Sequence, residues 1–301
     1  MQQGDIELSV LRRLFNVILV ILIIGSLMTA YVYKMARQRY NYQQTIFTME
    51  DTKGDDYGPG TYIYPFDSVF DPKNGLFDLT NFTFSALRNN YCFDMTFPLV
   101  TNPWGASEGF SHTIIEIYIN DGTDNGKIEP LIEGANIVFD PKDPWNYLLK
   151  VVSFNNTAVY WASDYVGASG KTEGIQVKLM ADKRTIRVTV PKILLPGDPK
   201  TWKYCVLVGS MDGAGPDNFR VVNASTSQWN FGGGTDTDYD PNVIDMLALP
   251  GEQKTMLGSY DFSKKVQAIV KPVGPAPLKN ERWNNFLDKA IALFQRMNWK
   301  L

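Results

Sequence analysis

Short apolar stretches separated by clusters of Gly, Pro, Asn and Asp run from residue 40 to residue 270, and this pattern narrows the fold more than any other feature. Residues 91–97 alternate between apolar and other side chains, as expected of a strand with one buried face. Residues 113–119 are β-branched and aromatic, and residues 175–180 and 185–190 flank a hairpin turn. Many short strands without a long amphipathic helix between them predict an all-β, antiparallel β-sandwich.

Residues 14–33 form an uncharged apolar segment bounded by Arg13 and Lys34. About 20 helical residues span the roughly 30 Å hydrocarbon core of a bilayer, so we expect a transmembrane helix here. A buried core helix and a cleaved signal peptide are the alternatives. A signal peptide usually has a shorter apolar region that ends in small residues, and Thr29-Ala30-Tyr31 matches that cleavage pattern poorly.

Composition and missing motifs exclude several classes of function. The net charge is −3, from 29 basic and 32 acidic residues, and no basic stretch interleaves with aromatic residues, so nucleic acid is not an expected partner. Two cysteines and one histidine cannot supply the four ligands of a structural zinc site. Dinucleotide-binding and P-loop glycine motifs are absent, as is a nucleophile-elbow serine. We therefore expect no catalytic residues and no enzyme activity.

The end of the sequence returns to helical periodicity. Residues 271–278 form a Pro-rich linker, and in residues 279–301 apolar side chains recur at three- and four-residue spacing opposite basic ones. This predicts a C-terminal amphipathic helix. Three alternatives are open for this helix: it packs on its own domain, lies at the membrane interface or docks on a partner. We expect that this helix and the transmembrane helix both contact other subunits of a membrane complex.

Several motifs follow one another in an order that is more specific than any one of them. They include Gly58-Pro59-Gly60-Thr61-Tyr62, Asn102-Pro103-Trp104, Gly109-Phe110-Ser111, Gly209-Ser210-Met211-Asp212-Gly213, Trp229-Asn230-Phe231-Gly232-Gly233 and Pro241-Asn242-Val243-Ile244-Asp245. Over roughly residues 47–260 this set resembles the C-terminal module of glucodextranases and archaeal amylopullulanases, a branch of the DOMON β-sandwich superfamily. The resemblance implies a sandwich of two antiparallel sheets, here over residues 47–270, that binds sugar or the cell surface.

The chain departs from this family in its N-terminal part. In the relatives the module is attached to a secreted carbohydrate-active enzyme, whereas here a membrane segment stands where the catalytic domain would be. We therefore expect a non-catalytic, membrane-anchored module that binds carbohydrate or glycoprotein at the cell surface. An accessory subunit of a multisubunit membrane complex, for example a respiratory one, is the alternative. An electron carrier with b-type haem is the third, because some superfamily members bind haem and a fold does not fix function.

Orientation in the membrane follows from what lies beyond the apolar segment. Basic residues on its two sides nearly balance, so the positive-inside rule does not decide. Glycosylation sequons begin at Asn81, Asn155 and Asn223. Together with the resemblance, they favour a single-pass protein of the cell membrane with residues 1–13 in the cytoplasm, residues 34–46 as a connector and the remainder outside.

Tryptophans and acidic loops supply the candidate binding residues. Trp104, Trp161 and Trp229 are candidates for stacking on sugar rings, with burial in the core as the alternative. Oxygen-rich loops also suit calcium, which takes six to eight oxygen ligands, although Asx turns explain the same spacing. The calcium candidates are Asp55, Asp56, Asp236, Asp238 and Asp240.

Two further pairs of residues carry alternatives that the sequence leaves open. Haem-binding DOMON proteins use Met with His or Lys, and the resemblance makes His112 and Met95 the haem-ligand candidates here, against a plain polar role for His112. Cys92 and Cys205 each follow a Tyr on an expected strand. In an oxidising compartment they form a candidate disulfide, and two separately buried thiols are the alternative.

Overall fold

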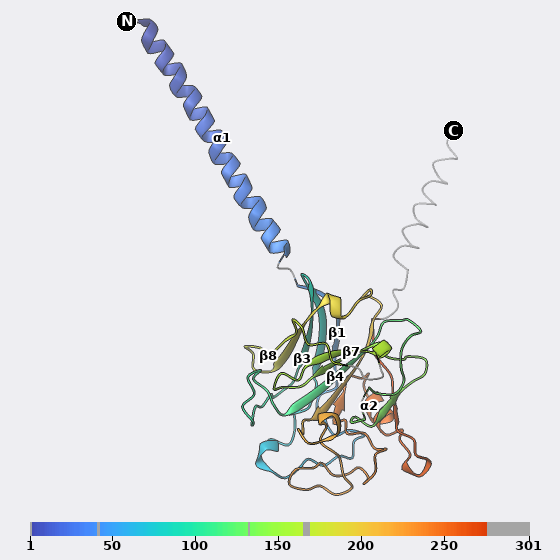
Figure 1. The fold of residues 1–301 in the computed structure, drawn as a ribbon. Helices are drawn as coiled ribbons and strands as arrows, with labels where there is room; N and C mark the ends of the chain where they lie inside the picture. The colour runs from blue at the N-terminus through green and yellow to red at the C-terminus, as the bar shows by residue number, and fades with distance from the viewer. Residues whose placement is uncertain (1, 41–42, 132, 165–168, 276–301) are drawn as a thin grey trace, which may run out of the picture.

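The computed structural model of the chain describes residues 2–40, 43–131, 133–164 and 169–275. Helix α1 (Gln2–Tyr40) extends away from the β-strands (Figure 1). Its segment Leu14–Met35 has a mean hydropathy of 2.3 and is long and apolar enough to cross a membrane. All side chains of the segment Leu14–Met35 are exposed, so its apolar surface requires an apolar environment. The helix expected over residues 279–301 lies outside the described residues.

Two five-stranded sheets make up most of the remaining chain. The first has the strand order β1 (Gln43–Glu50), β2 (Asn81–Leu87), β3 (Asn90–Thr96), β9 (Thr185–Pro191), β8 (Gln176–Leu179). The second has the order β11 (Asp245–Met246), β10 (Lys203–Ser210), β4 (Thr113–Asn120), β6 (Tyr147–Val151), β7 (Ala158–Trp161). Neighbouring strands within both sheets are antiparallel, which confirms the predicted fold class, and the expected hairpin is β8–β9.

Alternate side chains of the two sheets form one core between them. Strand β3 contributes Tyr91, Phe93 and Met95, as its alternation predicts, and each is at most 5% exposed. Ile115 and Ile117 of β4 face them from the second sheet. The period of two in the sequence thus places one row of each strand in this core.

The second sheet is also buried on its outer face. Every residue of β4 is buried, because Ile114 and Tyr118 pack into a second core that forms under long connecting segments. These segments include the parallel pair β5 (Ile137–Phe139) and β12 (Ala268–Val270) and the short helix α2 (Glu252–Leu257). The second sheet is therefore a middle layer.

The first sheet, in contrast, has an outer face that is only partly buried. Its strand β9 alternates between buried and half-buried residues along its whole length. Strand β1 at the edge of this sheet begins at Gln43, inside the 34–46 stretch expected to be a connector. The sequence did not indicate this start because the first residues of β1 are polar, are not buried and show no alternation.

Loops at the end of the sandwich away from α1 hold most of the irregular structure. Figure 1 shows the long segment that follows β10 and the segment between β1 and β2 at that end. Strand β10 ends there at Ser210, which pairs with Thr113 at the start of β4. The segments that precede β4 and follow β10 therefore lie next to each other.

A buried ion pair lies on the outer face of the second sheet. Lys150 of β6 donates to Asp217 and, at 3.0 Å, to the side chain of Asn218. Its neighbour across the strand pair is Glu116, which is 1% exposed and accepts a hydrogen bond from Tyr118 Oη at 2.9 Å. Burial, together with repulsion from Asp217, raises the pKa of Glu116 well above its usual value. Lys150 is thus the cation in contact with a buried group of carboxyls.

We expect Lys150→Met to lower the free energy of unfolding by about 3–5 kcal/mol, because it leaves Asp217 buried without its cation. Tryptophan fluorescence during urea unfolding of the full chain in mild detergent measures this. The matched control is Lys264→Met, since Lys264 pairs with Asp261 at the surface with a side chain that is 76% exposed. The control should leave the unfolding free energy nearly unchanged. Equal effects of the two substitutions would contradict a special role for the buried pair.

Candidate functional site

Two of the three candidate tryptophans lie in one pocket at the loop end of the sandwich. The pocket has a volume of about 400 Å³, within the range of small-ligand sites. It is lined by Trp104, Phe154, Met211, Asp212, Gly213, Arg220 and Trp229, and we call it the aromatic pocket. Three of its rings remain exposed to a similar degree, Trp104 at 38%, Phe154 at 41% and Trp229 at 40%.

Hydrogen bonds within the segment before β4 fix the position of Trp104. The side chain of Asn102 donates to the carbonyl of Ala106 at 2.9 Å and accepts from its amide at 2.8 Å, which closes a tight loop. The Trp104 amide donates to Ser111 Oγ at 3.1 Å. The indole then packs edge-on against His112, with ring centroids 5.2 Å apart.

His112 is buried beneath the aromatic pocket and packs against Trp104 in its wall. It is 1% exposed, and its ring lies 4.7 Å from Phe70 and 5.2 Å from Phe77. Burial lowers the pKa of His112 to about 3, so the ring is neutral at physiological pH. Its Nδ1 lies 3.2 Å from the hydroxyl of Thr101.

Trp229 lies at the tip of a turn. The glycines that follow it allow this loop to pack closely against a neighbouring loop. Ser227 and Asn230 form the turn, with Ser227 N donating to the carbonyl of Asn230 at 3.0 Å. Gly233 has φ 88°, and a Cβ there would collide with the carbonyl oxygen of Thr61. The Gly-Gly of this motif therefore lets two loops approach each other closely.

A charged pair forms the polar wall of the aromatic pocket. Arg220 is 5% exposed, and its guanidinium lies 3.2 Å from Asp212 Oδ2 and lies over the ring of Phe70 at 5.5 Å. It also donates to the carbonyl of Met211 at 2.9 Å. Arg220 is therefore held in place, and the side chain of Asp212, 31% exposed, keeps part of its carboxylate open to solvent.

Phe154 completes the aromatic wall in a strained conformation. Its φ is 61°, and that of the next residue, Asn155, is 59°. A bulky residue with positive φ is an outlier that costs of order 1–3 kcal/mol and occurs most often at functional sites. The sequence carries no sign of this conformation, so Phe154 was not among the candidates, and Arg220 was missed as well.

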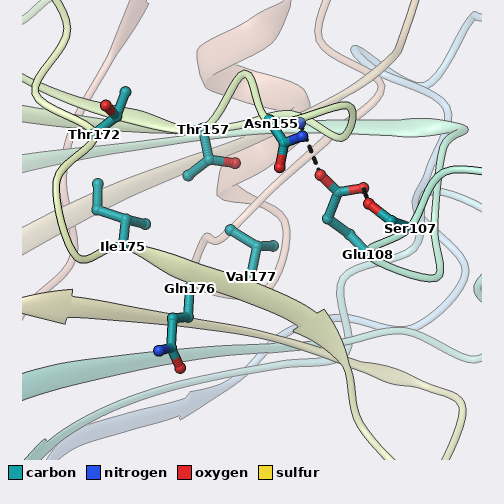
Figure 2. A pocket seen from close by; sticks show the side chains of 8 residues that line it. All are labelled: Ser107, Glu108, Asn155, Thr157, Thr172, Ile175, Gln176 and Val177. Atoms are coloured by element: carbon teal, nitrogen blue, oxygen red, sulfur yellow. Dashed lines mark hydrogen bonds between the residues drawn. The ribbon is translucent and has the colours of Figure 1, made fainter.

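A second pocket lies beside the loops that carry Trp104 and Phe154. It has a volume of about 450 Å³ and is lined by Ser107, Glu108, Asn155, Thr157, Thr172, Ile175, Gln176 and Val177, and we call it the polar pocket. Figure 2 shows the carboxylate of Glu108 directed at Asn155, whose backbone amide donates to Glu108 Oε1 at 2.8 Å. Burial alone would raise the pKa of Glu108, but the hydrogen bonds, chiefly that from Asn155, lower it below its usual value. The carboxylate is thus ionised.

The third candidate tryptophan, Trp161, lies away from both pockets on β7. Its Nε1 donates to the carbonyl of Leu194 at 2.8 Å, and Lys171 Nζ lies 4.3 Å from its ring centroid. Trp161 is half-buried and lines neither pocket, so its role in sugar binding stays a prediction from the sequence.

The five candidate calcium ligands are divided between two places. Asp55 and Asp56 lie in the segment after β1, near other buried aspartates. In the second loop, Asp236 accepts from the amide of Ala224 at 3.0 Å, and Asp240 accepts from the amide of Thr235 at 3.0 Å and from its hydroxyl. Asp238 is exposed. Hydrogen bonds within the segment after β10 thus occupy one carboxylate oxygen of Asp236 and both of Asp240.

The structure does not contain the candidate disulfide, because Cys92 and Cys205 are both free and buried. Cys205 lies in the outer core of the second sheet. Cys92 lies between Tyr91 and Phe93 on β3, and because these two face the core between the sheets, its own side chain points to the opposite face of the first sheet. The core between the sheets therefore separates the thiols.

The candidate haem ligands are packed in protein. Met95 has no exposed surface and belongs to the core between the sheets, and His112 is enclosed by aromatic rings. Neither lines the aromatic pocket or the polar pocket. A haem site at these two residues therefore stays a prediction from the sequence.

The three sequon asparagines differ in accessibility. Asn81, in β2, is half-buried and its amide donates to the carbonyl of Met49 at 3.2 Å, while Asn223 is also half-buried. Asn155 is exposed at the rim of the polar pocket.

Comparison with known proteins places the sandwich in a family. Residues 46–272 match the family described as the C-terminal, SLH-like binding module of glucodextranase. No curated protein matches the chain. The match begins and ends close to the first and last strands of the sandwich and covers most of the 301 residues. The chain therefore belongs to the family of glucodextranase C-terminal binding modules.

Proposed function

We propose that this protein is a membrane-anchored, non-catalytic module that binds carbohydrate in the aromatic pocket. The observation that carries the proposal is the meeting of Trp104, Phe154 and Trp229 around one opening, each more than a third exposed. Large aromatic side chains are normally covered in the folded state, and exposed ones that cluster mark binding sites. A pyranose ring has apolar C–H faces that stack on such rings.

The polar groups of the pocket suit the hydroxyls of a sugar. Asp212 accepts hydrogen bonds, and Arg220, which holds it, supplies a donor beside the same opening. A few fixed polar groups among apolar walls give orientation and specificity in small-ligand sites. The polar pocket next to it, with Glu108, Thr172 and Gln176, offers further acceptors and donors to the next sugar units of a chain. The proposed ligand is therefore an oligosaccharide and not a monosaccharide.

A binding role without catalysis agrees with the acidic residues at hand. Glycoside hydrolysis needs a pair of carboxylates that flank one bond. Asp212 in the aromatic pocket is paired with Arg220, and Glu108 in the polar pocket accepts from the Asn155 amide at 2.8 Å, so both carboxylates take part in contacts within the protein. The family, too, is described as a binding module.

The position of the pocket suits a protein that binds at a cell surface. The loops that carry Asp212 and Trp229 lie at the end of the sandwich away from α1 (Figure 1). With Leu14–Met35 in a membrane, the aromatic pocket faces away from the bilayer. The accessory-subunit alternative depends on contacts of the transmembrane helix and of residues 279–301, and the latter lie outside the described residues.

Replacement of Trp104 or Trp229 by Ala should weaken binding at least about tenfold, since each substitution removes roughly 1.5 kcal/mol of ring stacking. The measurement is binding of the full chain in mild detergent to an array of immobilised glycans that includes α-glucans. Trp161→Ala is the matched control, because it removes a tryptophan outside both pockets and should keep wild-type binding. Binding lost in the control, or retained in both pocket variants, would contradict the proposal.

The membrane anchor has its own test. The intact mass of protein extracted from membranes should include residues 14–35, and protease added to whole cells should digest the sandwich. A mass that lacks this segment would show cleavage as a signal peptide.

We also expect Ile23→Arg to reduce membrane insertion, since a charge at the helix centre costs about 2.5–3.5 kcal/mol, whereas Met35→Arg at the end should be tolerated because the side chain reaches the interface.

A further inference from the structure

Four aspartates from distant parts of the chain meet where the two sheets adjoin. Asp51 follows β1, Asp55 lies in the next turn, Asp78 precedes β2 and Asp245 belongs to β11. One carboxylate oxygen from each of Asp51, Asp55 and Asp245 lies within 4.8 Å of the other two. We call these four residues the aspartate cluster.

The cluster contains buried oxygens that have no hydrogen-bond donor. Asp51 is 8% exposed and Asp78 is 4% exposed. One oxygen of each accepts a backbone amide, from Ala248 to Asp51 Oδ1 and from Gly54 to Asp78 Oδ2, both at 3.1 Å. The other oxygens, Asp51 Oδ2 and Asp78 Oδ1, are buried without a partner, as is Asp55 Oδ1. Buried carboxylate oxygens normally have partners, so these indicate a missing positive group.

No ion pair in the described part of the protein supplies such a group to the aspartate cluster. Among the described residues, none of the ion pairs includes a member of the aspartate cluster. Burial raises the pKa of Asp51 to about 7 and that of Asp55 to about 6, and repulsion from the neighbouring carboxylates adds to both shifts. Lys53 lowers the pKa of Asp78, but burial outweighs it. The negative charge of the cluster is therefore not balanced by an ion pair among the described residues.

The donor set favours calcium over other metals. All the candidate ligand atoms are carboxylate oxygens, whereas zinc sites use Cys and His. One oxygen from each of Asp51, Asp55 and Asp245 lies within 4.8 Å of the other two, so one ion can contact all three. Magnesium has shorter bonds and keeps several waters, so it suits a cluster of this many carboxylates less well.

We propose that Asp51, Asp55 and Asp245, with Asp78 beside them, bind a calcium ion that ties the segment between β1 and β2 to β11 of the second sheet. Hydrogen bonds already join these parts, from Gly58 N to the carbonyl of Ile244, just before β11, at 2.7 Å. Gln253 of α2 bridges them as well, since its Nε2 donates to the carbonyl of Asp55 at 2.5 Å and its Oε1 accepts from the Met246 amide at 2.8 Å. The ion strengthens this connection at a place where charge repulsion otherwise weakens it. It is independent of the proposed carbohydrate site, which uses none of these four residues.

Calorimetric titration of the full, chelator-treated chain in mild detergent with calcium chloride at pH 7.5 tests the site. We expect saturable binding of one ion, and a melting temperature that is roughly 5–10 °C higher at a free calcium concentration of about one hundred times Kd than in EGTA. Absence of binding heat together with equal melting temperatures would overturn the proposal.

Two variants locate the ion. Asp51→Asn keeps the shape of the side chain and its acceptor for Ala248, so it should fold; it should melt above the wild type in EGTA, because it relieves repulsion, and lose the response to calcium. Asp238→Asn, an exposed member of the other acidic loop, should keep the full response. A wild-type response in Asp51→Asn, or a lost response in Asp238→Asn, would contradict this location.

Discussion

The burial of the second sheet on both faces is the constraint on which the rest of the sandwich depends. Strand β4 has apolar residues in both of its rows, with Ile115 and Ile117 toward the first sheet and Ile114 and Tyr118 toward the outer core. The first sheet covers only one of these two faces of the second sheet. Long connecting segments must therefore cross the other face, and they bring helix α2, strand β12 and the buried Lys150–Asp217 pair with them. The large loops are thus part of the core as well as surface connections.

The aromatic pocket follows from where these segments start and end. Ser210 at the end of β10 is paired with Thr113 at the start of β4, so the segments next to them are neighbours in space. One carries Trp104 and the other carries Asp212, Arg220 and Trp229. His112 and Phe70 fill the space beneath with aromatic surface, which leaves the rings above without room to sink into the core. Exposed rings on a packed base form a rigid surface that loses little entropy on binding.

The sequence predicted what local periodicity determines. Alternation located β3 and β9 and indicated their buried rows, β-branched and aromatic composition located β4, and the order of the loop motifs indicated the family. It did not predict which tryptophans meet, because that depends on loops more than a hundred residues apart: Trp161 has the same local signals as Trp104 but is fixed by Leu194 and Lys171.

The acidic residues show the same limit of local patterns. Asp236, Asp238 and Asp240 have the spacing of a metal loop, yet the carboxylates of Asp236 and Asp240 accept hydrogen bonds from the backbone amides of Ala224 and Thr235. Asp51, Asp78 and Asp245 stand singly beside strands and gave no signal. The fold alone brings them together, as the contact between the Leu79 amide and Asp245 Oδ2 at 2.5 Å illustrates. The strained backbone of Phe154 is likewise a product of tertiary packing.

The most direct measurement of the central claim is fluorine NMR of the full chain labelled with 5-fluorotryptophan. The seven tryptophans give resolved probes, assigned by single Trp→Phe variants, and the chain is titrated with an oligosaccharide that the glycan array identifies. The account predicts that the resonances of Trp104 and Trp229 shift together in a saturable way while that of Trp161 stays in place. Saturable shifts confined to other tryptophans would place the sugar elsewhere and contradict the aromatic pocket as the binding site.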